Sequence, residues 1–316
     1  MQKLIPVFSI LLFAFLGAAV AGAQAQSTFS IAAWTDKGEC TKPPTFDPTL
    51  NGKPTKVDEQ LSPSSDEIIL IVFDLTGDLS RVDEAKQAVI SQVSKLPSNT
   101  WVGVLRGQHG LHVLTDPTSN RQKVIDIIQS ISSNGTPGLL ETVRPVLTLA
   151  DAMIRKSPVR VSVLYITDGS IYRYRENYTD PVINPSDKHD LSRRFRGVLV
   201  NEKISKLERH LSSLEAPLFV VHLHYRQNQL DLAYQNGLDS LVQSTGGELV
   251  TCRSMAEIPQ AISHIFWRMS NVWRLVLAVP PRAHNTLQVG LKAKCGDNGL
   301  QLSWRPRFRP RKRGVE

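Results

Sequence analysis

Oxygen-bearing side chains recur in three short segments that could together form a metal site. The segments are DLTGD at 74–78, NGTPG at 134–138 and ITDG at 166–169. Their possible ligands are Asp74, Thr76, Asp78, Thr136 and Asp168. Hard cations such as Mg²⁺ prefer carboxylate and hydroxyl oxygens in a near-octahedral arrangement. The sequence therefore predicts a site for Mg²⁺ or a similar divalent cation, if the fold brings the three segments together.

Helix capping and turn formation explain the same residues more simply. Asp78 could cap the helix that follows it, because short polar side chains accept hydrogen bonds from free amides at a helix start. Thr136 followed by Pro137 is likewise typical of a helix N-terminus. Asp168 precedes a glycine, which is common in turns. The residue types alone leave the metal site and the capping interpretation open.

A tyrosine- and arginine-rich segment, residues 170–197, leaves the same predicted strand as Asp168 and should lie over the metal site. Tyr and Arg are enriched among the residues that dominate binding at protein interfaces. The candidate partner-binding residues are Tyr172, Arg173, Tyr174, Arg175, Arg194 and Arg196. The segment indicates a surface for a protein or a polyanionic glycan, a lid that pairs with Asp78, or a long solvated loop.

Apolar patterns around these segments alternate between strand and helix. Apolar runs predict strands at 67–74, 100–107, 111–116, 159–169, 216–225 and 248–252. Helical spacing of apolar residues predicts helices at 80–96, 120–131, 134–156, 199–215, 230–247 and 256–272. This alternation predicts an α/β fold, with a doubly wound, mostly parallel sheet and helices on both faces. Ligands of such sheets bind outside the carboxyl ends of strands, where the strand order reverses.

The order of the oxygen-bearing segments resembles the von Willebrand factor type A domain, over about residues 67–270. The resemblance implies a Rossmann-like domain with a metal-ion-dependent adhesion site. Four residues match the family's ligands: Asp74, Thr76, Thr136 and Asp168. Asp78 departs from the pattern, because the family has a serine at that position. A third acid near the ion would lower its net positive charge, which implies a degenerate site that disfavours an acidic partner.

Both ends of the chain lie outside the predicted domain. Residues 1–25 combine an apolar core with a final A-x-A pattern, which is typical of a cleaved secretory signal. We therefore expect an exported protein, periplasmic or secreted, without a transmembrane segment after cleavage. Residues 26–66 are polar and proline-rich, and we expect an extended leader there. Residues 271–304 resemble a β-hairpin extension found in exported bacterial proteins called VWFA-related, which are frequent in Acidobacteria.

The net charge of +8 is concentrated in a basic tail at residues 305–316. Without the six positive side chains of WRPRFRPRKR, the rest of the chain carries only about +2. We therefore expect no nucleic-acid binding. The tail itself is expected to be a solvated end, or to contact an anionic surface or envelope polymer.

Three cysteines predict one disulfide in an oxidising compartment. Cys40 precedes the predicted domain and Cys295 follows it, so we expect these two to pair across the ends. Cys252 lies in a predicted strand and is expected to be a buried thiol.

These features predict a non-enzymatic binding module of the adhesion or scaffold kind. Two alternatives remain open: a structural component of the cell envelope with a silent metal site, and a hydrolase that uses a metal-bound water. The hydrolase is disfavoured because no His or Lys that could act as a base lies in the three segments.

Overall fold

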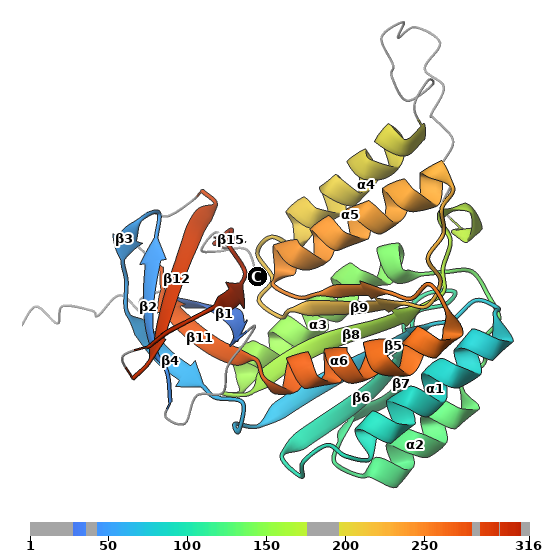
Figure 1. Cartoon of the computed structure of the whole chain (residues 1–316), viewed down its shortest axis with the longest axis horizontal. Coiled ribbons are helices and arrows are strands. Elements are labelled where there is room, and N and C mark those ends of the chain that lie inside the picture. Colours follow the sequence, from blue (N-terminus) through green and yellow to red (C-terminus); the bar gives the residue numbers. More distant parts are fainter. Residues whose placement is uncertain (1–27, 36–42, 176–195, 280–284, 297, 311–316) are drawn as a thin grey trace, which may run out of the picture.

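A six-stranded sheet with the order β10-β9-β8-β5-β6-β7 forms the larger part of the molecule (Figure 1). Neighbouring strands run parallel, except that β7 is antiparallel to β6. The strands are β5 (Glu67–Asp74), β6 (Thr100–Arg106), β7 (His112–Thr118), β8 (Arg160–Thr167), β9 (Leu218–His222) and β10 (Leu249–Thr251). The computed structural model describes residues 28–35, 43–175, 196–279, 285–296 and 298–310. It confirms the predicted doubly wound, mostly parallel sheet.

Helices cover both faces of this sheet because its central strands are apolar on both sides. In β5, Ile69, Ile71 and Phe73 pack with α1, α2 and α6. The alternate residues Leu70 and Val72 pack with α3, α4 and α5 on the opposite face (Figure 1). The helices are α1 (Leu79–Val93), α2 (Arg121–Ser130), α3 (Leu139–Lys156), α4 (Arg196–Leu211), α5 (Gln229–Thr245) and α6 (Ile258–Ser270).

The remaining strands form a β-sandwich beside the α/β part (Figure 1). One sheet has the order β14-β1-β11-β4, and the other has the order β13-β12-β2-β3, with β15 also paired to β12. Residues from both sheets, such as Phe29, Leu275 and Val289, share one apolar core. The strands are β1 (Thr28–Thr35), β2 (Thr45–Leu50), β3 (Lys53–Pro54), β4 (Val57–Leu61), β11 (Trp273–Ala278), β12 (Leu287–Cys295), β13 (Asn298–Leu300), β14 (Leu302–Trp304) and β15 (Arg307–Phe308).

The expectation of an extended leader is wrong, whereas the C-terminal extension does contain a hairpin, formed by β12 and β13. Residues 28–35 and 45–61 form β1 to β4, and Phe29 and Ile31 are only 2% and 1% exposed. β1 and β4 pair with β11, whereas β2 pairs with β12. β11 and β12 therefore lie in different sheets and do not pair with each other. The two ends of the chain build one sandwich, because each supplies the strands that the other needs.

Two connections join the sandwich to the α/β part, and the buried side chain of Arg160 is bonded to both. These connections are residues 62–66 and 271–272. Nη2 of Arg160 donates to the Pro63 carbonyl at 2.7 Å, and Nη1 donates to the Val272 carbonyl at 3.2 Å. Arg160 is 3% exposed. It fixes both connections at the amino-terminal edge of the sheet, because β8 begins at this residue.

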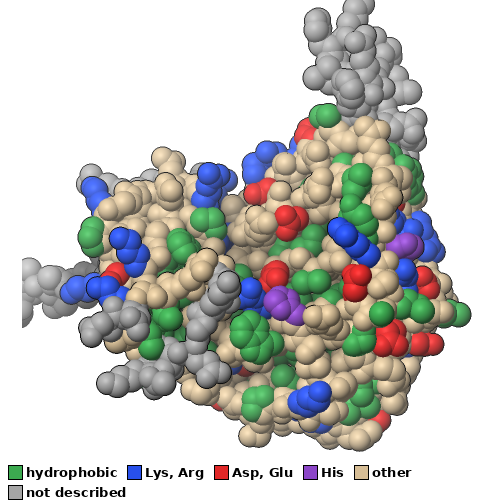
Figure 2. All heavy atoms as spheres, viewed as in Figure 1, with side chains coloured by type: hydrophobic (Ala, Val, Ile, Leu, Met, Phe, Trp, Pro, Cys, Tyr) green, Lys and Arg blue, Asp and Glu red, His purple; other side chains and the backbone are tan. Residues whose placement is uncertain are grey.

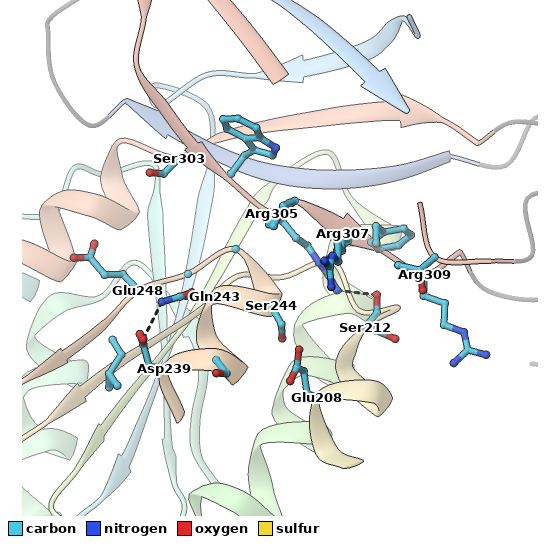
Figure 3. A pocket seen from close by; sticks show the side chains of 18 of the residues that line it. Glu208, Ser212, Asp239, Gln243, Ser244, Glu248, Ser303, Arg305, Arg307 and Arg309 are labelled. Carbon is cyan, nitrogen blue, oxygen red and sulfur yellow. Dashed lines mark hydrogen bonds between the residues drawn. The ribbon is translucent and has the colours of Figure 1, made fainter. Parts of the chain in front are cut away.

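The basic tail is not a solvated end at its beginning. Arg305 is 1% exposed and donates to the Ser212 carbonyl at 2.7 Å and to the Leu214 carbonyl, just beyond α4 (Figure 3). The exposed Arg307 and Arg309 help to line a cleft of about 1020 Å³ between α5 and the strands β14 and β15 (Figure 3). Residues 311–316 lie outside the described residues. Arg305 thus docks the sandwich on the helical layer.

Other expectations about the ends fall partly outside the described residues. The signal segment 1–25 and the residue Cys40 both do, so the cleaved signal and the Cys40–Cys295 pairing stay predictions. Cys295 takes part in a disulfide, and Cys252 is confirmed as a buried free thiol. Among the helices that the structure describes, none is both long and apolar enough to span a bilayer.

Candidate functional site

The oxygen-bearing segments meet at the carboxyl edge of the central sheet, between β5 and β8. The ends of these neighbouring strands lie in register, with Asp74 opposite Thr167. The chain continues from β5 to β6 on one side, but from β8 to β9 on the other, so the strand order reverses here. The strands run away from the β-sandwich (Figure 1). The candidate site therefore lies at the far end of the α/β part, at the place where open sheets bind ligands.

Asp74 ends β5, and its carboxylate holds the start of α3. Oδ1 accepts a hydrogen bond from the Gly138 amide at 2.8 Å, and Oδ2 accepts one from the Leu139 amide at 3.2 Å and one from the Thr167 hydroxyl at 3.0 Å. The side chain is fully buried. Removal from water raises the pKa of the Asp74 carboxyl to about 7, although these hydrogen bonds favour the ionised form. Asp74 thus ties β5 to β8 and α3.

Asp168 follows β8, and its carboxylate closes the loop that leaves β5. Oδ1 accepts from the amide and the hydroxyl of Thr76, at 2.6 and 2.9 Å. Oδ2 accepts from the amides of Gly77 and Asp78, at 3.1 and 3.2 Å. Asp168 is 2% exposed. Its two oxygens therefore receive four hydrogen bonds from one loop, which leaves the carboxylate well stabilised without any ion.

The Asp78 side chain caps α1. Oδ1 accepts from the Arg81 amide at 3.4 Å, and Oδ2 lies 3.0 Å from Arg81 Nε. The Asp78 side chain is 40% exposed. The sequence leaves open whether Asp78 is a metal ligand or a helix cap, and in the structure it is a helix cap. The negative charge of Asp78 is paired with Arg81, on the helix that it begins.

Thr136 is engaged elsewhere and does not cap α3. Its hydroxyl lies 3.2 Å from Nδ1 of His109. The N-cap residue of α3 is Gly138, so this helix begins later than the sequence suggests. The structure therefore brings Asp74, Thr76 and Asp168 together, while the side chains of Asp78 and Thr136 have other partners.

Three arginine side chains are anchored on main-chain carbonyls at the ends of neighbouring strands. Arg173 Nη2 donates to the Thr76 carbonyl at 2.7 Å, and Nη1 donates to the Thr76 hydroxyl at 3.3 Å. Arg81 Nη1 donates to the Leu223 carbonyl at 2.7 Å. Arg226 Nη2 donates to the Asp168 carbonyl at 3.3 Å.

Arg81, Arg173 and Arg226, here called the arginine triad, thus follow β5, β8 and β9. Of the three, only Arg173 is a predicted site residue. The spacing of Asp78 and Arg81 on a helix is a signal for their pairing. No motif marks Arg226.

This arrangement does not fit an octahedral Mg²⁺ ion. The oxygens of Asp74 and Asp168 already accept hydrogen bonds from the protein. The Thr76 hydroxyl faces the guanidinium of Arg173, which carries a fixed positive charge. In the described part of the chain, no three His, Cys, Asp or Glu side chains form a possible metal-binding group. Cation binding therefore stays a prediction, and the donor set argues against it.

The tyrosine- and arginine-rich segment divides into exposed and buried side chains. Tyr172 is 55% exposed, and Arg173 and Arg175 are also exposed. Tyr174 is buried, with its hydroxyl 2.8 Å from that of Tyr234 on α5, so it is a packing residue. Arg194 and the side chain of Arg196 lie outside the described residues. The described candidates that remain available to a partner are Tyr172, Arg173 and Arg175.

The central part of the chain is similar to a known protein family. Residues 70–170 match the sequence model described as von Willebrand factor type A domain. No curated protein is detectably similar in sequence.

Three solved structures share features of the fold. The first is von Willebrand factor type A from Catenulispora acidiphila, at 10% identity and a TM-score of 0.45, covering 93% of this chain and 76% of that chain. The second is the PilB minor pilin from Streptococcus sanguinis, at 12% identity and a TM-score of 0.44, covering 69% of this chain and 64% of that chain. The third is the vWF domain of the type V pili tip protein Mfa5 from Porphyromonas gingivalis, at 13% identity and a TM-score of 0.41, covering 64% of this chain and 94% of that chain. The match spans 64% of the length of the pilin. At such identities the likeness concerns the fold alone.

Proposed function

We propose, on the premise that this chain carries a von Willebrand factor type A domain, that it is an exported protein-binding module of the adhesion or scaffold kind that works without a bound cation. The observation that carries the proposal is the contact of Arg173 with Thr76. The guanidinium meets both the carbonyl and the hydroxyl of the residue that the sequence assigns as a metal ligand. The strand-end loop is therefore satisfied by the chain's own side chains.

The exposed residues at this edge support a protein partner. Tyr172 is 55% exposed and directly precedes Arg173. Exposed Tyr and Arg side chains on a rigid support are typical hot-spot residues, because they combine apolar contact area with hydrogen-bond donors. Tyr172 and Arg173 belong to a short 3₁₀ helix (Ile171–Arg173) that contacts α5, which gives them such a support.

The residues at this edge of the sheet do not support a catalytic role. A hydrolase needs a carboxylate or an imidazole that can reach a substrate and accept a proton from it. Asp74 and Asp168 are buried, and both carboxylates already accept several hydrogen bonds from the protein. His222 is buried as well, and its Nε2 faces the Gly169 carbonyl at 3.0 Å. We therefore propose binding rather than turnover as the role of this edge.

Site-specific photo-crosslinking tests the proposal. A photoreactive amino acid replaces Tyr172, and the purified variant is illuminated in an envelope extract of the source cells, with and without EDTA. We expect the same crosslinked protein in both samples. The control places the photoreactive group at Trp267, which is 50% exposed near the end of α6. Crosslinking that requires a divalent cation, that is equal at Trp267, or that yields no protein adduct would overturn the proposal.

A further inference from the structure

The arginine triad has donors that the fold leaves unused. We propose that Arg81, Arg173 and Arg226 form an anion-binding site that takes the carboxylates of an acidic segment of a partner protein. This inference rests on the proposed function, since it names the chemistry of the partner that this edge would bind. It assigns to arginines the positive charge that the sequence predicts for a metal ion.

The fold holds the three guanidinium groups along one edge. Their anchors are the carbonyls of Thr76, Leu223 and Asp168, which follow β5, β9 and β8. These strands are neighbours in the sheet, and adjacent strands lie about 4.8 Å apart. The anchors therefore span a width of about 10 Å, which suits a few consecutive residues of a peptide.

Arg173 is the member of the triad most available to a partner. A guanidinium has five N–H donors, and the two hydrogen bonds to Thr76 use only part of them. Arg173 is exposed, and among the described residues it makes no ion pair. A carboxylate could therefore accept two parallel hydrogen bonds from it. Arg226 supports this edge with a second guanidinium, whose buried Nε has no hydrogen-bond acceptor among the described residues and lies 4.0 Å from Asp231 Oδ2.

Two members of the triad, Arg81 and Arg226, face nearby acidic groups, whereas Arg173 makes no ion pair among the described residues. Asp78 is paired with Arg81, which takes away the acid that the sequence analysis expected to repel an acidic partner. The Asp168 carboxylate is turned inward, onto the amides of the β5 loop. Asp231 is 2% exposed and accepts from the Ser170 hydroxyl and the Ile171 amide. Its Oδ2 also lies 4.0 Å from Arg226 Nε, so the charge of Arg226 is partly balanced within the fold. The positive charge of Arg173 is thus left facing solvent.

A protein segment fits this surface better than an extended anionic polymer. The triad is confined to three strand ends, and the adjacent Tyr172 offers aromatic contact area that a peptide can cover. On the face shown in Figure 2, basic and acidic side chains are interspersed over the α/β part of the molecule. A nucleic acid or a long polyanion would be matched by a continuous basic stripe.

The test uses fluorescence anisotropy with a labelled decaglutamate peptide as the probe. We expect the purified protein to bind it in EDTA, with no gain on adding Mg²⁺. Arg173→Ala should weaken binding about 10- to 100-fold, because a charge-assisted hydrogen bond is lost. Arg173→Lys should restore it only in part, because the charge returns without the planar fork. Arg309→Ala, at an exposed arginine of the sandwich end, should bind like the wild type.

Each other outcome overturns the inference. Equal binding of decaglutamate by the wild type and both Arg173 variants would show that the triad does not recognise the peptide. Equal binding of a decalysine probe would show that charge complementarity does not drive the binding. A galacturonate oligomer of the same charge that binds as tightly as the peptide would point to a glycan. Circular dichroism melting curves confirm that the variants are folded. If crosslinking at Tyr172 succeeds and decaglutamate does not bind, the inference fails while the proposed function stands.

Discussion

The buried imidazole of His222 makes the stability of this domain depend on pH. His222 is the last residue of β9 and is 1% exposed. Its Nε2 lies 3.0 Å from the Gly169 carbonyl and must carry the proton, because a carbonyl only accepts. Its Nδ1 accepts from the His224 amide at 3.4 Å. A second proton on the ring would face that N–H group, so the geometry fits the neutral ring.

The size of the effect follows from the pKa of His222 in the two states. Burial is the main reason why this pKa falls from 6.5 to about 4. The charge of Arg226 acts in the same direction, while the Gly169 carbonyl, Asp231 and Asp168 act in the opposite direction. The two values differ by about 2.5, which corresponds to about 3 kcal/mol. The unfolded chain binds the proton more readily. The free energy of unfolding therefore carries this contribution in full above pH 6.5 and loses it as the pH falls from 6.5 through 4.

Urea unfolding of the wild type and of His222→Gln between pH 4 and pH 7.5 measures this contribution. Glutamine stays neutral, and its amide nitrogen can donate to the Gly169 carbonyl as Nε2 does. We expect the wild type to lose about 3 kcal/mol more than the variant over this range, since the carboxylates shared by both cancel in the difference. His224→Gln, at a residue that is only partly buried, is the control. Parallel pH profiles of the wild type and His222→Gln would refute the reasoning.

Three further substitutions test other parts of the structure. Arg305→Met leaves the Ser212 and Leu214 carbonyls without their donor, so we expect urea unfolding to show a free energy of unfolding lower by about 2–5 kcal/mol. A change under about 0.5 kcal/mol, as is usual at a surface site, would contradict the docking role. Asp78→Ala removes the cap of α1 and should lower the free energy of unfolding by about 1 kcal/mol. Calorimetry should show the same heat on Mg²⁺ addition in the variant and the wild type. A difference in heat would indicate that Asp78 is a metal ligand. Gly247→Ala would place a Cβ 1.7 Å from a main-chain oxygen and should prevent folding, as judged by circular dichroism, whereas Gly299→Ala, with open space around it, should fold.

The α/β part could be predicted from the sequence because its signals are local. The apolar runs of β5 and β8 are both buried on both faces of the sheet. Each run therefore predicts a central parallel strand even when its neighbouring strands are not known. The sandwich could not be predicted in this way. β1 pairs with β11, with Phe29 opposite Leu277, so the partner of each strand lies at the other end of the chain. Pro48 lies within β2, where proline argues against a strand.

The candidate site could be predicted in position but not in chemistry. The loop after β5 and the loop after β8 do meet, because strand order and direction are encoded in the alternation of elements. Whether Asp78 faces an ion or a helix depends on side-chain rotamers, which one sequence does not reveal. The contact of Arg173 with Thr76 joins residues that are far apart in the chain. It depends on the path of the 3₁₀ turn after β8, for which no sequence motif exists.

The double connection fastened by Arg160 bears on how the molecule would carry a mechanical load. The connections leave the amino-terminal edge of the sheet, and the triad lies at the opposite edge. A pull applied at the triad is transmitted along β5 and β8 and enters the sandwich through two covalent paths in parallel. Because Arg160 bonds to both paths, neither can swivel independently of the other. We therefore expect the α/β part to resist rotation relative to the sandwich when force is applied, as a domain on a single flexible linker would not.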